Sequence, residues 1–191
     1  NIQNCITRMS PILKKFFKKG IADQLEEMVQ NARKEEQEMN KARAAADQLM
    51  NNRKYQEAYE GYKAIMEKYG DEIDVDWYRR RIVWDLCTHR WRNQKLARQL
   101  SEQYYKETDS AYWLKMLIDL NYRYDPKNYE AALTWLKVAA DRNDMDPWWV
   151  ASHMYDTYMA LRKPSEAAGW IEHWLTKNPK DPNVPSAMYR A

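Results

Sequence analysis

Four segments of the chain resemble one another and recur at nearly equal intervals, which limits the folds that the chain can adopt. The alanines at positions 58, 97, 131 and 167 are separated by 39, 34 and 36 residues. A period near 35 with two helices per period is typical of an α-solenoid, in which stacked helix pairs share a continuous core. Alanine suits this position because two antiparallel helices approach closely only where a side chain is small. The four segments are Tyr55–Ala58, Gln94–Ala97, Asn128–Ala131 and Pro164–Ala167.

Glycine and proline residues between these segments mark the ends of helices and divide the chain into helix pairs. Apolar residues between these ends follow helical and not strand periodicity, so we expect an all-α fold without a sheet. The glycine and proline residues are Gly70, Pro126, Pro147, Pro179 and Pro182. The predicted helix pairs are 39–50 with 55–69, 75–90 with 94–107, 109–123 with 128–142, and 147–161 with 164–177. The predicted domains are an N-terminal extension over 1–38, a solenoid of about four antiparallel helix pairs over 39–182, and a C-terminal tail over 183–191. The extension is expected to contain a basic amphipathic helix and most of one long helix over 21–50. The segment after Asn178 is expected to be extended and to end in a short turn.

The composition agrees with a helical protein that needs no disulfides. Only 4 glycines and 7 prolines occur among 191 residues, and both residues disfavour helix interiors. Cys5 and Cys87 lie far apart and lack metal-ligand spacing, so we expect free thiols in a reducing compartment. No apolar run reaches the roughly 18 residues of a membrane span, and no secretory signal is recognisable. The chain begins at Asn1 without an initiator Met, which fits a trimmed chain or a processed mature protein that has lost an organellar presequence.

The first twenty residues form a basic amphipathic stretch. Its apolar residues have helical spacing, and no acidic residue offsets its positive charge. The stretch is either a capping helix that packs on the repeats or an arm that docks on an acidic partner or a membrane surface. The candidate contact residues are Lys14, Lys15, Lys18 and Lys19.

The sequence offers no arrangement of residues that predicts catalysis. None of the three histidines has a second His or Cys at metal-ligand spacing. His153 with Asp156 and Asp85 with His89 lie one helical turn apart, as ordinary surface contacts often do. Glycine-rich phosphate loops and nucleophile elbows are absent from the sequence. We therefore predict that the protein is not an enzyme and binds no metal or cofactor.

A basic aromatic segment is the first candidate contact surface. Trp77, Trp84 and Trp91 lie seven residues apart, so we expect one buried stripe with the arginines outside it. Arginine beside aromatic rings suits both nucleic acid and an acidic protein surface. The candidate contacts are Arg79, Arg80, Arg90 and Arg92.

Adjacent tryptophans mark the second candidate contact surface. Trp148 and Trp149 point in different directions on a helix, so we do not expect both to be fully buried, and one is expected to be a partner contact. Trp170 and Trp174, four residues apart, are instead expected to pack beneath the C-terminal tail.

The last two helix pairs resemble the tetratricopeptide and pentatricopeptide repeat superfamily. The third reads Ala-Tyr-Trp-Leu-Lys-Met-Leu-Ile-Asp-Leu from Ala111, then Tyr-Glu-Ala-Ala-Leu from Tyr129, and ends in Asp-Met-Asp-Pro. The fourth repeats this plan with Ser165-Glu166-Ala167-Ala168. The period and the Asp-Pro opening are more similar to the pentatricopeptide form, and the resemblance covers residues 75–182 well and 39–70 loosely.

The resemblance implies a binding scaffold. Pentatricopeptide proteins usually read RNA with polar side chains on the first helix of each repeat. The matching positions here lie around Lys115 and Met116 and around Ser152 and His153, and only the latter pair suits base readout. About four repeats would read about four bases, which is too few for a unique transcript.

The size, the repeat number and the mildly basic net charge of +3 are also similar to those of the additional repeat-containing subunits on mitochondrial F1-ATPases of kinetoplastid-type protists. We therefore predict a non-catalytic structural or adaptor subunit that binds protein partners in a larger assembly, in the mitochondrial matrix or otherwise in the cytoplasm. One alternative is an RNA-binding protein of an organellar ribosome or RNA-processing complex. The other is a peptide-binding tetratricopeptide module of a bacterial cytoplasm.

Overall fold

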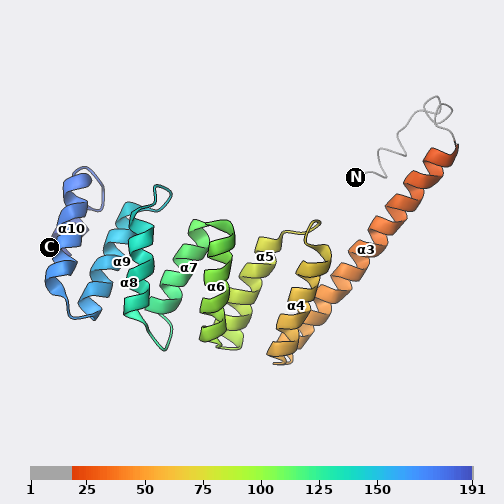
Figure 1. Cartoon of the computed structure of the whole chain (residues 1–191), viewed down its shortest axis with the longest axis horizontal. Helices are drawn as coiled ribbons and strands as arrows, with labels where there is room; N and C mark the ends of the chain where they lie inside the picture. The colour runs from red at the N-terminus through yellow and green to blue at the C-terminus, as the bar shows by residue number, and fades with distance from the viewer. Residues whose placement is uncertain (1–18, 191) are drawn as a thin grey trace. The chain divides into compact units, whose positions relative to one another are not determined.

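The computed structural model describes residues 19–190, and it describes side chains from Gln24 onward. Every regular element in this range is helical, which confirms the all-α prediction for these residues. The chain divides into two compact units, one up to Tyr78 and one from Arg79, and the division falls inside α5. None of the described helices is long and apolar enough to cross a membrane. The helices are α3 (Lys19–Asn51), α4 (Tyr55–Tyr69), α5 (Val75–Arg80), η1 (Arg81–Arg90), α6 (Gln94–Thr108), α7 (Ala111–Tyr122), α8 (Tyr129–Ala140), α9 (Pro147–Ala160), α10 (Pro164–Lys177) and α11 (Val184–Arg190) (Figure 1).

In the first unit, α3 and α4 form an antiparallel pair. Their interface buries Ala46 and Met50 of α3 together with Tyr62 and Ile65 of α4. A Cβ atom on Gly61 would lie 3.2 Å from the Cβ of Ala46, so the missing side chain lets the two backbones approach. The predicted border at residue 38 lies inside α3, which continues without a break from Lys19.

In the second unit, each helix packs against the next one along the chain, from η1 through α6, α7, α8, α9 and α10 to α11. Side chains from four consecutive helices, α7 to α10, form its main core cluster. The cluster includes Leu114 and Ile118 of α7, Leu136 of α8 and Met154 of α9, all fully buried. Sequential packing of this kind is what the helical periodicity predicts.

The small residues predicted at the helix contacts are buried, with one shift of register. Ala58, Ala97 and Ala167 are completely buried. In the third pair the completely buried alanine is Ala132, whereas Ala131 is half-buried. The buried alanines at 58, 97, 132 and 167 are therefore separated by 39, 35 and 35 residues, which is more regular than the sequence pattern suggested.

The segment that follows α5 is a π-helix and not the α-helix predicted for residues 75–90. Two side chains support the wider turn by donating to carbonyl oxygens five residues earlier. The Thr88 hydroxyl donates to the Val83 oxygen at 2.7 Å, and the His89 ring nitrogen Nδ1 donates to the Trp84 oxygen at 2.7 Å. A π-helix of ten residues is unusual, because π-helical geometry mostly occurs as single-turn bulges, frequently at functional sites.

The wider turn explains why the prediction of one buried tryptophan stripe is wrong. Trp77 is 41% exposed, Trp84 is 39% exposed and Trp91 is half-buried. A spacing of seven returns to one face only when a turn holds 3.6 residues, and a π-helix holds more. The buried positions of η1 are instead Ile82, Val83, Leu86, Cys87 and Thr88. Burial raises the pKa of the Cys87 thiol to about 12, so this thiol stays protonated and unreactive at neutral pH.

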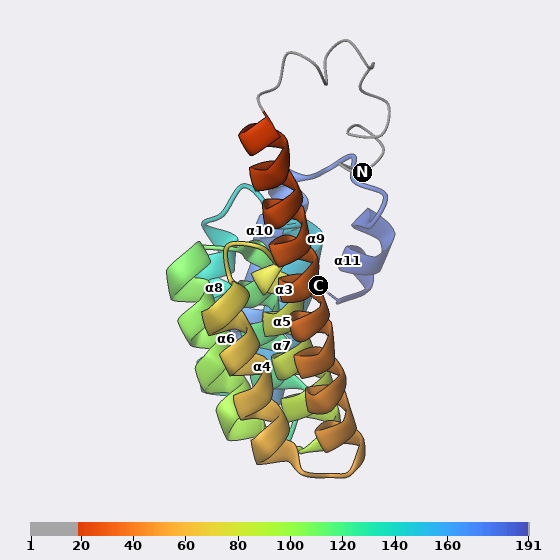
Figure 2. The same cartoon turned by 90° about the vertical axis from the view of Figure 1, so that its right-hand side faces the viewer.

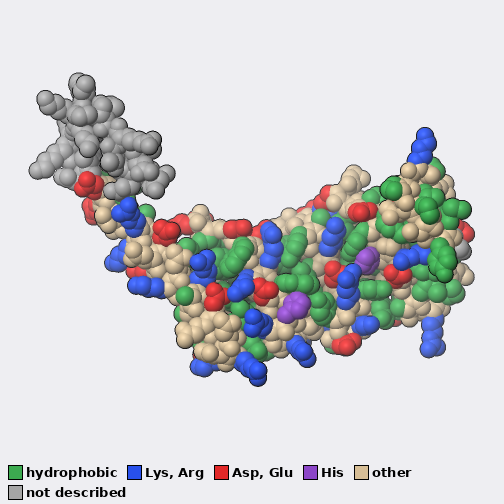
Figure 3. Space-filling view, turned by 180° about the vertical axis from the view of Figure 1, so that it is seen from behind, with side chains coloured by type: hydrophobic (Ala, Val, Ile, Leu, Met, Phe, Trp, Pro, Cys, Tyr) green, Lys and Arg blue, Asp and Glu red, His purple; other side chains and the backbone are tan. Residues whose placement is uncertain are grey.

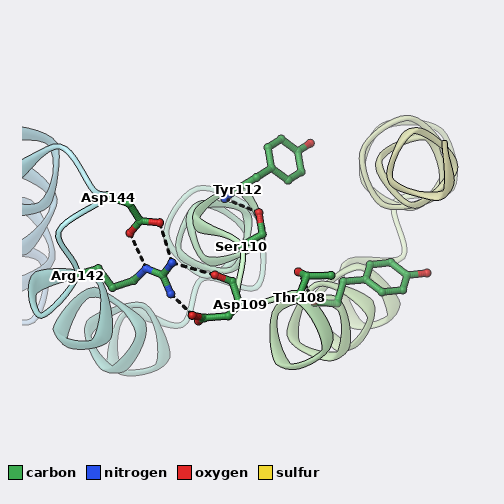
Figure 4. A network of polar contacts seen from close by, with 7 residues as sticks. Thr108, Asp109, Ser110, Tyr112, Arg142 and Asp144 are labelled. Carbon is green, nitrogen blue, oxygen red and sulfur yellow. Dashed lines mark hydrogen bonds and ion pairs between the residues drawn. The ribbon is translucent and has the colours of Figure 1, made fainter.

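Arg142, which follows α8, holds two neighbouring loops together (Figure 4). Its guanidinium donates to the carboxylate and the backbone oxygen of Asp109, the residue that ends α6 in the left-handed region with φ 48°. It also forms a two-bond contact with the Asp144 carboxylate, at 2.8 and 2.7 Å. These hydrogen bonds hold the pKa of Asp144 below its usual range. Forked contacts of this kind suit arginine because its donors match a carboxylate in geometry.

Residues 184–190 form a helix, which corrects the prediction that the tail is extended and ends in a short turn. The Asp181 carboxylate accepts a hydrogen bond from the Asn183 backbone N–H at 2.8 Å, and α11 begins at the next residue. Buried Ala187 of α11 belongs to one apolar cluster with Trp174. Trp170 packs instead against the main core cluster, so only one of the two tryptophans lies beneath the C-terminal segment.

Candidate functional site

The first helices of the pairs in the second unit share one face, and we call it the first-helix face. In Figure 2, α7 and α9 lie on one side of this unit, and α6 and α8 lie on the other. Figure 3 views the first-helix face directly and shows basic, acidic and hydrophobic side chains intermixed over it. The residues that define the face are Arg80, Arg81, Trp84, Asp85 and His89 of α5 and η1, Tyr112, Lys115, Asp119 and Tyr122 of α7, Arg123 and Tyr124 after it, Trp148, Trp149, His153, Tyr155 and Asp156 of α9, and Arg190 of α11.

Cations of one helix lie over aromatic rings of another helix along this face. The Arg80 guanidinium lies 5.0 Å from the centre of the Tyr112 ring. The Lys115 ammonium lies 5.4 Å from the centre of the Trp149 ring. Arg190 lies 5.2 Å from the Tyr155 ring. Each contact joins two helices by attraction between a cation and the electron-rich face of a ring, a contribution of about 0.5–1 kcal/mol at exposed sites.

Each first helix also carries an aspartate that pairs with an arginine. Arg81 contacts Asp85 at 2.9 Å within η1. Arg123 contacts Asp119 at 2.9 Å at the end of α7. In both cases the residues lie four apart and therefore face each other on a helix. On α9 the aspartate is Asp156, and Arg190 contacts it from α11 at 3.4 Å. The three carboxylates keep this face from becoming uniformly positive.

An aromatic trio of exposed Trp84, exposed His89 and half-buried Tyr124 lies where η1 comes close to the α7–α8 loop. The Trp84 and His89 ring centres are 4.4 Å apart, and Tyr124 lies 6.4 and 6.2 Å from them. The His89 ring is fixed because its Nδ1 donates to the Trp84 carbonyl oxygen. The trio is therefore held in place before any partner arrives, which lowers the entropy cost of binding.

His153 of α9 lies on this face and has a lowered pKa. Burial is the main cause, because it disfavours the charged ring. The neutral ring stacks on Trp149 at 4.1 Å and donates from Nδ1 to the Trp149 carbonyl oxygen at 2.8 Å. Its Nε2 lies 3.5 Å from Nη2 of Arg123, which can donate to the neutral ring only. Asp119 and Asp156 act in the opposite direction and favour the charged ring.

We expect acid to destabilise the second unit through His153. Since the folded protein holds the pKa below the ordinary value of 6.5, the neutral ring contributes stability above that pH. This contribution is lost as the pH falls through the folded pKa, because the unfolded chain binds the proton more readily. Urea denaturation of the wild type and of His153→Gln between pH 7.5 and 5 tests this expectation. The wild type should lose more stability than the variant, and equal losses would contradict the assignment.

Of the four arginines predicted as partner contacts, one packs within the second unit and three are exposed. Arg79 pairs with Glu107 and lies over the Tyr104 ring at 4.7 Å, with its side chain 19% exposed. Arg80 is exposed and belongs to the first-helix face. Arg90 and Arg92 are exposed at the end of η1, close in sequence to the aromatic trio.

Both tryptophans of the predicted pair are half-buried and engaged within the second unit. The Trp148 ring lies 4.8 Å from the Trp174 ring and packs against the cluster beneath α11. The Trp149 ring stacks on His153 and packs against the main core cluster. Of the N-terminal candidates, Lys14, Lys15 and Lys18 lie outside the described residues, and Lys19 is the first residue of α3.

Several residues of the face were not predicted as partner contacts, although Asp85 and Asp156 were expected to make ordinary surface contacts. The aspartates at 85, 119 and 156 recur at intervals of 34 and 37, close to the repeat period, and this spacing could have identified the face. Tyr124 and Arg190 carry no such signal, because one lies in a loop and the other lies beyond the last pair.

Within the described part of the chain, no group of three or more His, Cys, Asp or Glu side chains could hold a metal ion. Comparison with protein-family models, with curated proteins and with solved structures finds no match to this chain.

Proposed function

We propose that the chain is an α-solenoid that acts as a non-catalytic structural or adaptor subunit and binds a protein partner through the first-helix face. The observation that carries the proposal is the fixed aromatic trio, in which Trp84 and His89 are exposed and Tyr124 is half-buried. Exposed aromatic residues and arginines are the commonest energetic centres of protein interfaces. Arg90 and Arg92 lie close by in sequence, so the partner surface should be acidic.

The charge arrangement favours a protein partner over RNA. A nucleic-acid groove needs cations that can contact phosphates and rings that can stack on bases. Here Asp85, Asp119 and Asp156 pair with three of the basic side chains and would repel a phosphate backbone. Tyr112 and Trp149 are already covered by cations of this chain. Alternating charges suit the mixed surface of a protein.

The particular assembly that we propose is the F1 head of a mitochondrial ATP synthase, in the mitochondrial matrix. The support for it is the resemblance in size, repeat number and net charge described above. In that assembly the partner subunits would carry out the nucleotide chemistry, and this chain would supply a binding surface only.

Affinity purification of the tagged full-length protein from its native source, with and without nuclease, tests the proposal. We expect a fixed set of proteins in constant ratio to the tagged chain, unchanged by nuclease. ATPase head subunits in that set would support the particular assembly. Recovery of RNA, with the associated proteins lost after nuclease treatment, would overturn the proposal in favour of an RNA-binding protein.

A further inference from the structure

Helix α3 carries an apolar stripe along its length, and α4 covers only part of it. Met39, Ala46 and Met50 belong to the C-terminal half of the stripe, where Ala46 is 1% and Met50 is 2% exposed. In the N-terminal half, Leu25 is 40% and Met28 is 66% exposed. We call this second part, made of Leu25, Met28, Val29 and Ala32, the bare stripe.

The bare stripe lies beyond the reach of α4. The end of α4 is marked by the contact of Lys68 with Glu38 of α3, at 3.5 Å. Residues Lys19–Glu38 therefore run past the end of α4, as Figure 1 shows. At 1.5 Å per residue this part of the helix is about 30 Å long. Between Gln24 and Glu38 every side chain is exposed except that of Val29, which is half-buried.

A helix in this situation needs a partner to be stable. An isolated helix of about 15 residues is marginal in water, since most helical stability in proteins comes from the packing of an apolar face. The spacing of positions 25, 28, 29 and 32 is that of a face which packs on another helix. The same stripe does so with α4 further along α3, so the bare stripe continues an existing helix–helix interface.

We propose that the bare stripe binds an amphipathic α-helix of a partner protein, with lysine or arginine residues beside the apolar stripe of that helix. The helical form follows from the continuity with the α3–α4 interface. The basic character follows from charge, because residues 24–38 contain five glutamates against Arg33 and Lys34. This inference rests on the proposed function as a protein-binding subunit, but it concerns the first unit and not the first-helix face.

Photo-crosslinking in the full-length tagged protein tests the inference. A benzophenone amino acid replaces Met28 in one variant and Glu27 in the control, which lies about 160° away from Leu25 around the helix. Both positions are exposed, so the two probes differ mainly in the face that carries them. After irradiation of the purified assembly, mass spectrometry identifies the crosslinked peptide. Hydrogen exchange of residues 24–38 is measured in the free protein and in the assembly.

We expect position 28, and not position 27, to crosslink to a partner segment with helical apolar spacing and flanking basic residues. Amides of residues 24–38 should exchange rapidly in the free protein and slowly in the assembly. Leu25→Ser with Met28→Ser should weaken binding at least about tenfold, because two large apolar side chains would be lost from the interface.

Several outcomes would overturn the inference. They are a crosslink from position 28 to residues 1–18 of this chain or to a second copy, a crosslink to an acidic or non-helical segment, and equal hydrogen exchange in both states. If an assembly forms while position 28 stays uncrosslinked, the inference fails and the proposed function stands. If no assembly forms, both fail.

Discussion

Trp113→Ala should lower the free energy of unfolding by about 3–5 kcal/mol, the usual cost of removing a large aromatic side chain from a core. Trp113 of α7 is 1% exposed, and its ring lies 5.0 Å from the Tyr104 ring of α6. The loss includes both the transfer of the ring out of water and the cavity that remains, since neighbouring helices collapse only partly.

Urea denaturation followed by far-ultraviolet circular dichroism measures this loss. Trp84→Ala is the matched control, because Trp84 is 39% exposed and should cost less than about 1 kcal/mol. Equal losses in the two variants would show that Trp84, too, belongs to the core, and would remove the basis for the aromatic trio as a binding surface.

Arg98→Ala should cost about 2–3 kcal/mol, because one guanidinium on α6 donates to three backbone oxygens in the last turn of α7 and in the loop that follows it. It donates to the Leu120 oxygen at 2.7 Å, to the Tyr124 oxygen at 2.9 Å and to the Pro126 oxygen at 2.8 Å. Burial lowers the pKa of this arginine below its ordinary value. Without it, the loop that places Tyr124 in the aromatic trio loses its anchor.

Two further variants separate the geometry of Arg98 from its charge. Arg98→Lys keeps the charge but lacks the planar fork of donors, so it should recover only part of the stability. Lys95→Ala removes an exposed cation from the same helix and should change stability by less than about 0.5 kcal/mol. If Arg98→Lys were as stable as the wild type, the multiple hydrogen bonds would not be the source of the stability.

Helix positions were largely predictable from the sequence because local signals determine them. The predicted ranges 55–69 and 164–177 coincide with α4 and α10. The first begins with the repeated segment Tyr55–Ala58, and the second begins at Pro164. The α11 helix was missed because Pro179 and Pro182 predicted the end of helical structure, although α11 begins two residues after Pro182 and carries Pro185 in its first turn, where proline is tolerated. The burial of Ala132 in place of Ala131 depends on the rotation of α8, which tertiary packing sets.

The candidate site was less predictable because it depends on contacts distant in sequence. The π-helical geometry of η1 depends on hydrogen bonds to carbonyl oxygens five residues earlier, which the periodicity of apolar residues does not reveal. This geometry sets which side chains of η1 are buried, and Trp84 is exposed. Arg80 covers a ring 32 positions later, and Lys115 covers one 34 positions later. Such pairs become visible only when consecutive helices are placed side by side.

The most direct test of binding through the first-helix face is the ratio of partner protein to tagged chain recovered from the native source. This ratio is measured for the wild type and for Trp84→Ala. A variant with Lys106→Glu and Lys137→Glu, two exposed cations of the second helices α6 and α8, is the control. We predict that Trp84→Ala lowers the ratio by about thirtyfold, as expected for an energetic centre worth about 2 kcal/mol, while the control keeps the wild-type ratio. An unchanged ratio for Trp84→Ala, with the fold intact, would contradict binding through the first-helix face.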